Sequence, residues 1–408
     1  MSRARSGDLC QGRFDLDQSS SNVFDRPVPR SRSRQKISRR SEPDSFRRDR
    51  PSAHPHFRWR KGMTLAQGRY EVHGRLGEGT FGRVLAAKDL QTGESVAVKV
   101  GKGGDEFCEQ AVEEVEILQH IQHLHPGRES FCVKFLDSFL EPPKHFCLVF
   151  ERLGISLRDF LKRNSSCGLF VEDLRRIAQQ LLQGLAGLHT AGILHTDLKC
   201  RNVMLNDERY CAAPHPRDPG TEALRPQDCS IRIVDFGSAI HQDETFRGRA
   251  CTRQFRSPEV ALGLQWDEKL DIWSAGCIIA MLYTGVRPFS VHENQEHLAM
   301  MERLMDDRFP KHMLRTARRN RTDQDEASSD PDLEDFAATE DDRLDWPGKA
   351  SEAAVRRVEE LQPLSRQVLP RHGSFLSLLQ GLLRLDPQHR MDAVTGCKSP
   401  FFLEEVVE

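Results

Sequence analysis

Residues 193–203 read ILHTDLKCRNV. An apolar start leads into a histidine and a threonine, and Asp197, Lys199 and Asn202 follow within a few positions. An aspartate can accept the proton of a substrate hydroxyl or orient that hydroxyl, and an asparagine oxygen is the kind of ligand that Mg²⁺ prefers. The run thus places a group that could serve a hydroxyl proton and a group that could bind a metal ion on the same short segment.

A second acidic motif follows at residues 233–237, which read IVDFG. Its Asp235 offers a carboxylate, and one carboxylate, one amide oxygen and the oxygens of a nucleotide would together suit a hard ion such as Mg²⁺. Isolated DFG triplets are common accidents. The triplet becomes informative only through the order of the other motifs around it, which are described next.

A glycine-rich run, GEGTFGRV, occupies residues 77–84. Glycines let a backbone approach phosphates closely, because no side chain intervenes. The pattern GxGxxG also occurs in dinucleotide-binding folds, where a helix follows at once. Here residues 83–90, RVLAAKDL, indicate a strand and a turn. That context favours the loop that covers ATP phosphates in protein kinases.

A lysine, Lys99, ends the strand-like run VAVK at residues 96–99. A lone lysine at the end of a strand is usually just exposed, but after a glycine-rich loop it matches the lysine that holds the α- and β-phosphates of ATP. Such a lysine needs a partner glutamate on the next helix. Glu114 and Glu113 are both candidates, and we prefer Glu114 because EVEIL, from that residue on, resembles the usual kinase pattern.

The patterning of the chain predicts two lobes. Residues 70–100 alternate short β-branched runs with turns, which indicates an antiparallel meander, and residues 106–122 carry apolar positions at helical spacing. Two further strands are expected in CVKFLDSFL and HFCLVFERL, and the pattern after residue 155 is mostly helical. We therefore predict an α+β fold in which a small β-rich lobe precedes a larger α-helical lobe.

These motifs resemble the LAMMER (CLK-type, dual-specificity) protein kinases of the CMGC group over roughly residues 65–404. The motif that names the family has a close counterpart in EHLAMMER at residues 296–303. Further matches to the family are HTD at 195–197, DFGSA at 235–239, FERLG at 150–154 with Phe150 as gatekeeper, and DRLDW at 342–346.

The resemblance implies the bilobal eukaryotic protein kinase fold over residues 70–402. The N-lobe and hinge would span 70–153 and the C-lobe 154–402. Two segments would be surface insertions, one near 207–229 that is rich in proline and turns and one near 321–345 that is strongly acidic.

The resemblance also implies an ATP-dependent kinase that phosphorylates Ser and Thr, and Tyr during autophosphorylation, in arginine/serine-rich proteins. ATP and Mg²⁺ would be its cofactors. Asp197 would position the hydroxyl, Lys199 would offset charge on the transferring group, and Asn202 and Asp235 would hold Mg²⁺. The residues expected to bind ATP are Leu76, Gly77, Glu78, Gly79, Thr80, Phe81, Gly82, Val84, Ala97, Lys99, Glu114, Phe150, Glu151 and Leu153.

Three later motifs are expected to be structural. Residues 257–259, SPE, stand where APE usually closes the activation segment, and residues 271–276, DIWSAG, resemble a helix start of the family. Arg390 resembles the late arginine that pairs with the glutamate of APE. These residues would hold the segment that receives the peptide.

The chain departs from the family at three positions near the site. Arg201 stands where the usual LKPEN has a glutamate that in many kinases accepts a basic substrate residue. A like-charge contact at about 4 Å costs roughly 4 kcal/mol at an effective dielectric near 20, and solvent and salt reduce that cost. The acidic run 321–345 would either compensate or be a solvated loop. Phe255 replaces a tyrosine that could accept phosphate, and Ser257 for alanine should be mild.

A basic arm, predicted to be disordered, precedes the acidic body of the chain. Residues 1–62 hold about 16 Lys and Arg against 7 Asp and Glu, although the whole chain has a formal net charge of −2. Such an arm is either an interaction tail or simply solvated. Its RSRSR run at 30–34 is typical of nuclear localisation signals and nucleic-acid patches, so we expect nuclear residence, with the cytoplasm as a second compartment.

Composition narrows the remaining alternatives. The 11 cysteines form no CxxC pair, which favours reduced thiols over a disulfide framework or a zinc site. No apolar signal segment or membrane-length run is present, so we expect a soluble, intracellular and monomeric protein. A pseudokinase is the main alternative, and nucleic-acid binding is not expected because aromatic rings that could stack on bases, such as Phe57 and Trp59, are sparse in the arm.

Overall fold

The described part of the chain has gaps that affect some predictions. The computed structural model describes residues 56–79, 82–124, 130–217, 220–242, 250–291, 293–322 and 336–405. Most of the predicted disordered arm, Thr80 and Phe81 of the glycine-rich loop, and residues 323–335 of the predicted acidic insertion lie outside the described residues.

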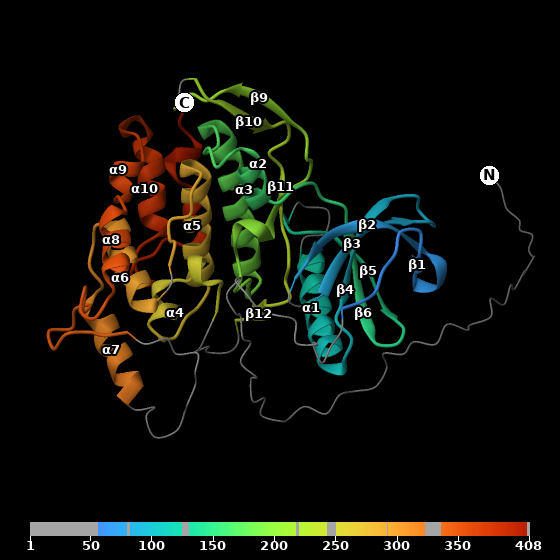
Figure 1. Ribbon diagram of the computed structural model, residues 1–408, viewed down its shortest axis with the longest axis horizontal. Coiled ribbons are helices and arrows are strands. Elements are labelled where there is room, and N and C mark those ends of the chain that lie inside the picture. Colours follow the sequence, from blue (N-terminus) through green and yellow to red (C-terminus); the bar gives the residue numbers. More distant parts are fainter. Residues whose placement is uncertain are drawn as a thin grey trace, which may run out of the picture. The chain divides into compact units, whose positions relative to one another are not determined.

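The first lobe is built on a six-stranded antiparallel sheet with the order β1-β2-β3-β4-β6-β5 (Figure 1). Its strands are β1 (Thr64–Leu65), β2 (Tyr70–Glu78), β3 (Gly82–Asp89), β4 (Ser95–Gly101), β5 (Phe135–Glu141) and β6 (His145–Glu151). Side chains alternate between the two faces of a strand. In β4, Val96, Val98 and Val100 are therefore buried in the core of the sheet, while Ala97 and Lys99 lie on the other face. The predicted meander is confirmed.

The helix α1 (Asp105–Leu124) follows β4 and packs against β4, β5 and β6. Its buried residues recur at helical spacing and include Ala111, Ile117 and Ile121. Glu114 lies on this same buried face, whereas Glu113 is exposed. A buried carboxylate is costly unless it is paired with a positive charge. We therefore expect a cation next to the Glu114 carboxylate.

The start of the described chain differs from the prediction of a disordered arm that extends to residue 62. Phe57 is buried in the core of the sheet, where its ring lies 5.1 Å from that of His145. Arg83 also donates to the Phe57 carbonyl at 2.8 Å. The polar composition of the segment did not predict this contact, because one aromatic residue is enough to anchor the segment to the sheet. Phe57 is consequently unsuited to act as an exposed stacking ring.

The second lobe is mainly helical, as predicted. Its helices are α2 (Leu157–Arg163), α3 (Val171–Thr190), α4 (Pro258–Ala261), α5 (Lys269–Thr284), α6 (Asn294–Met305), α7 (Lys311–Thr322), α8 (Glu352–Glu360), α9 (Leu364–Gln367), α10 (Gly373–Leu382) and α11 (Ala393–Gly396). Short 3₁₀ turns are η1 (Ala66–Gly68), η2 (Cys200–Asn202), η3 (Arg253–Phe255), η4 (Pro370–His372) and η5 (Pro400–Phe402).

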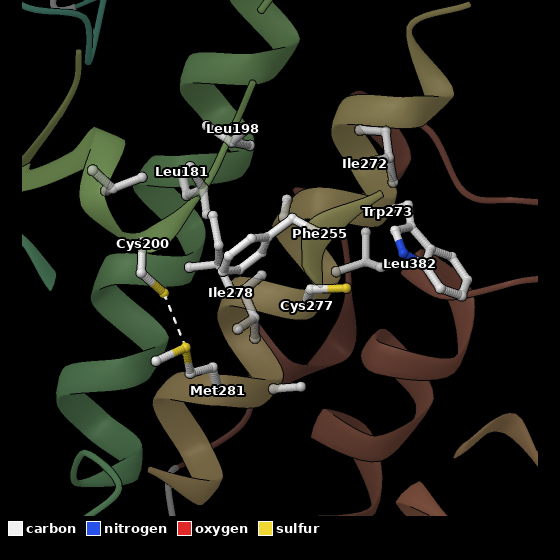
Figure 2. Packing of buried hydrophobic residues seen from close by; sticks show 14 of the residues in the cluster. Leu181, Leu198, Cys200, Phe255, Ile272, Trp273, Cys277, Ile278, Met281 and Leu382 are labelled. Carbon is white, nitrogen blue, oxygen red and sulfur yellow. Dashed lines mark hydrogen bonds between the residues drawn. The ribbon is translucent and has the colours of Figure 1, made fainter. Parts of the chain in front are cut away.

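The helix α5 is the centre of this lobe and is buried on every side. Figure 2 shows its Trp273 and Ile278 among side chains from α3 and α10, such as Leu181 and Leu382. A helix that is mostly apolar and buried all round is expected only in a core. Among the described residues no helix is both long and apolar enough to cross a membrane.

Two short ladders bring the polar motifs together. One joins β7 (Ile193–Leu194) to β12 (Ile240–His241), and the other joins β8 (Val203–Leu205) to β11 (Ile231–Ile233). The loop before β8 and the loop after β11 are therefore held side by side. These loops carry the HTD…N and DFG residues.

The segment predicted as an irregular insertion near 207–229 instead contains an antiparallel ribbon of β9 (Tyr210–Pro214) and β10 (Glu222–Pro226). Arg225 of this ribbon forms two hydrogen bonds, of 2.8 and 2.7 Å, to the carboxylate of Asp173 in α3. Its guanidinium also lies over the ring of Phe170. The ribbon was not predicted, because the segment is rich in prolines and turns and because the residues that anchor it lie far away in the sequence.

The second predicted insertion, near 321–345, begins within α7 and packs where it is described. Asp342 is buried and pairs with Arg315 at 2.7 Å and with Arg318 at 3.1 Å. Leu344 is buried as well. The described end of this segment is thus anchored to the lobe by Asp342 and Leu344, while residues 337, 339–341 and 343 are exposed.

Candidate active site

The buried cation that Glu114 requires is Lys99. The Lys99 Nζ donates to both carboxylate oxygens of Glu114, at 2.7 and 2.8 Å, and to Oδ1 of Asp235 at 3.0 Å. Strand β4, helix α1 and the DFG loop thus meet at one ammonium group. Gly237 lies beside this contact, since a Cβ there would be 3.2 Å from Glu114 Oε2.

Burial and charge oppose each other in this triad. Burial lowers the pKa of Lys99, but the carboxylates of Asp235 and Glu114 outweigh it and hold the pKa well above the usual value for lysine. Lys99 in turn lowers the pKa of Asp235, against the effect of burial. Lys99 and Asp235 are therefore both charged at neutral pH.

One face of the sheet beside Lys99 is apolar and only partly covered. Val84 is opposite Lys99 in the ladder of β3 with β4, and Ala97 is opposite Phe150 in the ladder of β4 with β6. Opposite residues in a sheet share a face. Leu76, which is 37% exposed, is also among the predicted ATP-binding residues. This face is suited to a flat, apolar ring.

The glycines of the glycine-rich loop differ in whether the structure leaves room for a side chain. A Cβ on Gly82 would lie 2.1 Å from the Val100 carbonyl oxygen, so this glycine is required by the packing of β3 on β4. A Cβ on Gly77 or Gly79 would meet no atom of the described residues within 4 Å. Those two glycines leave open space above the strand. Glu78 beside them forms ion pairs with Arg75 and Arg83.

The segment after β6 carries the predicted hinge. Leu153 is buried, and the ring of Phe150 lies 6.0 Å from that of Phe135. The Glu151 carboxylate accepts the backbone N–H of Lys134 at 2.8 Å and lies 3.6 Å from Arg232. Both the side chain and the backbone N–H of Glu151 are thus engaged with protein, since the N–H donates to the Lys134 carbonyl at 3.1 Å.

Asp197 is held by three donors. The backbone N–H and the hydroxyl of Thr252 donate to its Oδ1, at 3.1 and 2.8 Å. Lys199 Nζ donates to Oδ2 at 2.6 Å and to the Thr252 hydroxyl at 3.3 Å. This network fixes the carboxylate between the loop that carries it and the segment that follows DFG.

The loop ahead of Asp197 is anchored on Asp271 of α5. This fully buried carboxylate accepts the backbone N–H groups of His195 and Thr196 at 2.7 and 3.0 Å. Thr196 has φ +62°, a conformation that is costly for a β-branched residue. Its hydroxyl donates to the Ser238 carbonyl at 2.7 Å, which helps to offset the strain. Asp271 therefore sets the direction in which Asp197 points.

His195 links the two motif loops through both ring nitrogens. Its Nδ1 accepts the N–H of Asp197 at 3.3 Å, so its Nε2 carries the proton and donates to the Val234 carbonyl at 3.1 Å. The ring is completely buried. This arrangement requires a neutral histidine of one tautomer.

The residues present fit a magnesium ion that is held with nucleotide phosphates. The Asn202 amide donates to the Asp197 carbonyl at 3.0 Å, which leaves its oxygen without a protein partner among the described residues. Asp235 Oδ2 likewise has no such partner, and the Asp235 side chain is 40% exposed. Two oxygen donors suit a Mg²⁺ ion that takes its other ligands from phosphates and water. Within the described ranges no cluster of three His, Cys, Asp or Glu residues forms a separate metal site.

Thr252 and Asp271 are the site residues whose contacts were not predicted. Thr252 lies 55 positions from Asp197, and its only local signal is its place shortly before the SPE motif. Asp271 was assigned a structural role at a helix start, but not the contacts to His195 and Thr196. The roles of the remaining predicted site residues stay predictions.

The predicted pairing of Arg390 with the glutamate of SPE is confirmed. Arg390 donates to the two oxygens of Glu259 at 2.7 and 2.8 Å, and both side chains are at most 1% exposed. Arg390 also donates to the carbonyls of Arg384 and Lys269. This cluster ties the end of the activation segment to the helical core.

Ser257→Ala should stabilise the protein. The Ser257 side chain is fully buried, and its hydroxyl has no hydrogen-bond partner among the described residues. Removal of an unsatisfied buried hydroxyl should increase the free energy of unfolding by about 1 kcal/mol. Denaturant unfolding would measure this change, with Ser290→Ala, an exposed site, as the matched control. A loss of stability in Ser257→Ala would show that the hydroxyl has a partner.

Comparisons with known proteins agree with this geometry. Residues 70–402 match the family of the protein kinase domain. The chain is 37% identical over 348 residues to the serine/threonine-protein kinase AFC2 of Arabidopsis thaliana, over 82% of this chain and 77% of AFC2. It is 35% identical over 339 residues to the human dual specificity protein kinase CLK1, over 82% of this chain and 66% of CLK1.

Two further matches are a yeast kinase and a solved kinase domain. The dual specificity protein kinase lkh1 of Schizosaccharomyces pombe is 35% identical over 344 residues, which are 83% of this chain but 47% of lkh1. A crystal structure of a kinase domain superimposes with a TM-score of 0.76 at 32% identity, over 85% of this chain and 98% of the other. The chain thus spans less than two thirds of CLK1 and about half of lkh1.

Proposed function

Because the chain belongs to the protein kinase family, in its CLK-type (LAMMER) branch, and so phosphorylates proteins with ATP, we propose that it transfers the γ-phosphoryl group directly to serine and threonine hydroxyls. The observation that carries the proposal is the carboxylate of Asp197, fixed by Thr252 and Lys199 beside the DFG loop. Its geometry leaves Oδ2 as the oxygen that can face a substrate once Lys199 turns away.

The roles of the residues follow from their charges. The hydroxyl oxygen of the substrate forms a bond to the γ-phosphorus, the bond to ADP breaks, and Asp197 accepts the proton of the hydroxyl. Before the transfer, Lys199 leaves the carboxylate, and during the transfer it offsets charge on the transferring group. Lys99, held by Glu114 and Asp235, binds the other phosphates. Catalysis is mostly positioning and electrostatics.

Asn202 and Asp235 would hold Mg²⁺ through the oxygens that have no protein partner. When bound, the ion would neutralise phosphate charge. The apolar face formed by Val84, Ala97 and Phe150 would take the adenine ring.

The pseudokinase alternative has no support in the site. Lys99, Asp197, Asn202 and Asp235 are all present, and hydrogen bonds connect Lys99 to Asp235 and Asn202 to Asp197. A scaffold that only binds nucleotide would need neither the clamp of Thr252 on Asp197 nor the anchor on Asp271.

We propose further that arginine/serine-rich proteins are the substrates and that the protein is a nuclear monomer that also enters the cytoplasm. Membership of the LAMMER branch supports the substrate class, and the RSRSR run at residues 30–34 supports the compartment. A tagged chain in which this run is replaced by alanines should shift from the nucleus to the cytoplasm in microscopy. An unchanged nuclear signal would argue against the role of the run.

The test of the proposed function is phosphoryl transfer from ATP and Mg²⁺ to two peptides, an Arg-Ser repeat and a serine peptide flanked by acidic residues. Transfer to the Arg-Ser peptide by wild type, and its loss in Asp197→Ala, would support both the activity and the substrate class. Transfer only to the acidic peptide would overturn the substrate class. No transfer to either peptide or to a generic protein, with ATP still bound, would overturn the activity.

Tyrosine autophosphorylation, if it occurs within the chain, should fall on Tyr210. The chain has three tyrosines, and Tyr70 and Tyr283 are 1% and 3% exposed, whereas Tyr210 in β9 is 45% exposed. Phe255 occupies the place of the usual tyrosine in the activation segment. Mass spectrometry of protein incubated with ATP should find phosphotyrosine in wild type but none in Tyr210→Phe. Phosphate on Tyr70 or Tyr283 would contradict this expectation.

A further inference from the structure

The residue that breaks the family pattern, Arg201, is fixed in place at the edge of the site. Cys200 on one side is buried, with its Sγ 3.4 Å from Met281 Sδ of α5 (Figure 2). Asn202 on the other side is buried and bound to the Asp197 carbonyl. Arg201 itself is exposed and has no ion-pair partner among the described residues. Its guanidinium is therefore presented to solvent close to Asp197.

A second arginine lies on the neighbouring helix. Helix α2 packs against η2, and Arg158 in its first turn is half-buried. The Arg158 Nε is buried with no hydrogen-bond partner among the described residues. The adjacent Asp159 does not pair with Arg158. The Asp159 carboxylate instead accepts the Ser156 hydroxyl at 2.7 Å and lies 3.7 Å from the Lys162 ammonium. Arg158 thus keeps an uncompensated charge.

A third arginine, Arg287, follows the end of α5, next to the buried Pro288 and Phe289. Its pKa is lowered, first by partial burial and then by the positive charge of Arg158. It has no acidic partner in the part of the chain that the structure describes. Cys200 of η2 contacts Met281 in the last turn of α5, shortly before Arg287. The positive charges of Arg158 and Arg287 both oppose the rise that burial causes in the pKa of the Cys200 thiol.

Arg158 and Arg287 repel each other, and Arg201 adds a third positive charge on η2, against which the helix of Arg158 packs. Like charges that approach within several ångströms destabilise a protein unless an anion joins them. Guanidinium groups bind phosphate and carboxylate oxygens through paired N–H donors. A bound anion would also satisfy the buried Arg158 Nε.

Resting on the proposed phosphoryl transfer at Asp197, we propose that Arg158, Arg201 and Arg287 bind an anionic side chain of the peptide substrate, a phosphoserine or an acidic residue close to the hydroxyl that is phosphorylated. An arginine of the peptide would be repelled at this position. An Arg-Ser repeat that already carries phosphate would then be a better substrate than the same repeat without it.

The experiment measures kcat/KM of the full chain for matched Arg-Ser peptides in which one serine, moved stepwise along the peptide, is replaced by phosphoserine, aspartate or alanine. Wild type should favour phosphoserine over alanine at one position by roughly tenfold to a hundredfold, the value of hydrogen bonds to a charged group. A similar gain with aspartate identifies a general anion site, and a gain with phosphoserine alone identifies a site for phosphate. Equal values at every position would overturn the proposal.

Variants then assign the effect to the three arginines. Arg201→Glu and Arg287→Gln, both at exposed positions, should each reduce the preference for phosphoserine, and Arg163→Gln at the exposed end of α2 should not. An unchanged preference in both Arg201→Glu and Arg287→Gln would also overturn the proposal. Failure of the proposed function would look different, because wild type would then transfer phosphate to none of these peptides nor to a generic protein.

Discussion

Asp197→Asn should lower kcat for phosphoryl transfer by roughly 10²- to 10⁴-fold, the usual contribution of a positioned general base. The amide oxygen of asparagine can still accept the two hydrogen bonds from Thr252. Its NH₂ group, however, can accept neither a proton nor the N–H of Lys199. The KM for ATP should change little, because the cluster of Lys99 with Glu114 and Asp235 is untouched.

Steady-state kinetics with a peptide substrate, together with calorimetric titration of ATP, would separate the two effects. Asp105→Asn is a matched control, because the Asp105 side chain is 79% exposed and pairs only with Lys144 on the surface of the first lobe. A decrease in kcat of less than tenfold in Asp197→Asn would count against Asp197 as the group that handles the hydroxyl proton, since that loss is smaller than a general base supplies.

Arg390→Met should destabilise the fold by about 3–5 kcal/mol, the usual cost of a buried ion pair that loses one partner. The substitution leaves the Glu259 carboxylate uncompensated, at 1% exposure. It also removes the donors that serve the carbonyls of Arg384 and Lys269. Denaturant unfolding followed by intrinsic fluorescence would give the change.

The double variant tests the cause. Adding Glu259→Gln to Arg390→Met removes the uncompensated charge, so the double variant should be more stable than Arg390→Met alone. The double variant should remain less stable than wild type, because the carbonyls of Arg384 and Lys269 still lack the donors of Arg390. If the two substitutions instead add, the carboxylate of Glu259 is not the source of the cost.

Local sequence patterns were sufficient where a contact follows from chain order. The run VAVK after the glycine-rich loop identified Lys99, and the resemblance of EVEIL to the kinase pattern favoured Glu114 over Glu113, which agrees with the burial of Glu114 in α1. The motifs around Asp197 and Asp235 were recognised because each is short and continuous. In all these cases one secondary-structure element determines where the side chain points.

Contacts between distant segments could not be predicted in the same way. Asp271 reaches Thr196 across 75 positions, and nothing near either residue encodes that distance. The ribbon of β9 and β10 was hidden because its anchor, Arg225 on Asp173, joins two surfaces that come together only in the fold. Sequence alone showed the reversed charge of Arg201, but its neighbours Arg158 and Arg287 required the structure.

The most direct test of the central claim is a single-turnover experiment with wild type in excess over γ-labelled ATP, in the presence of Mg²⁺ and an Arg-Ser peptide. If Lys99, Asp197, Asn202 and Asp235 form a working phosphotransfer site, the label should move from ATP into the peptide hydroxyls at the rate at which ATP disappears. Label that stays in bound ATP, or that is released as inorganic phosphate without entering the peptide or any protein, would contradict the account.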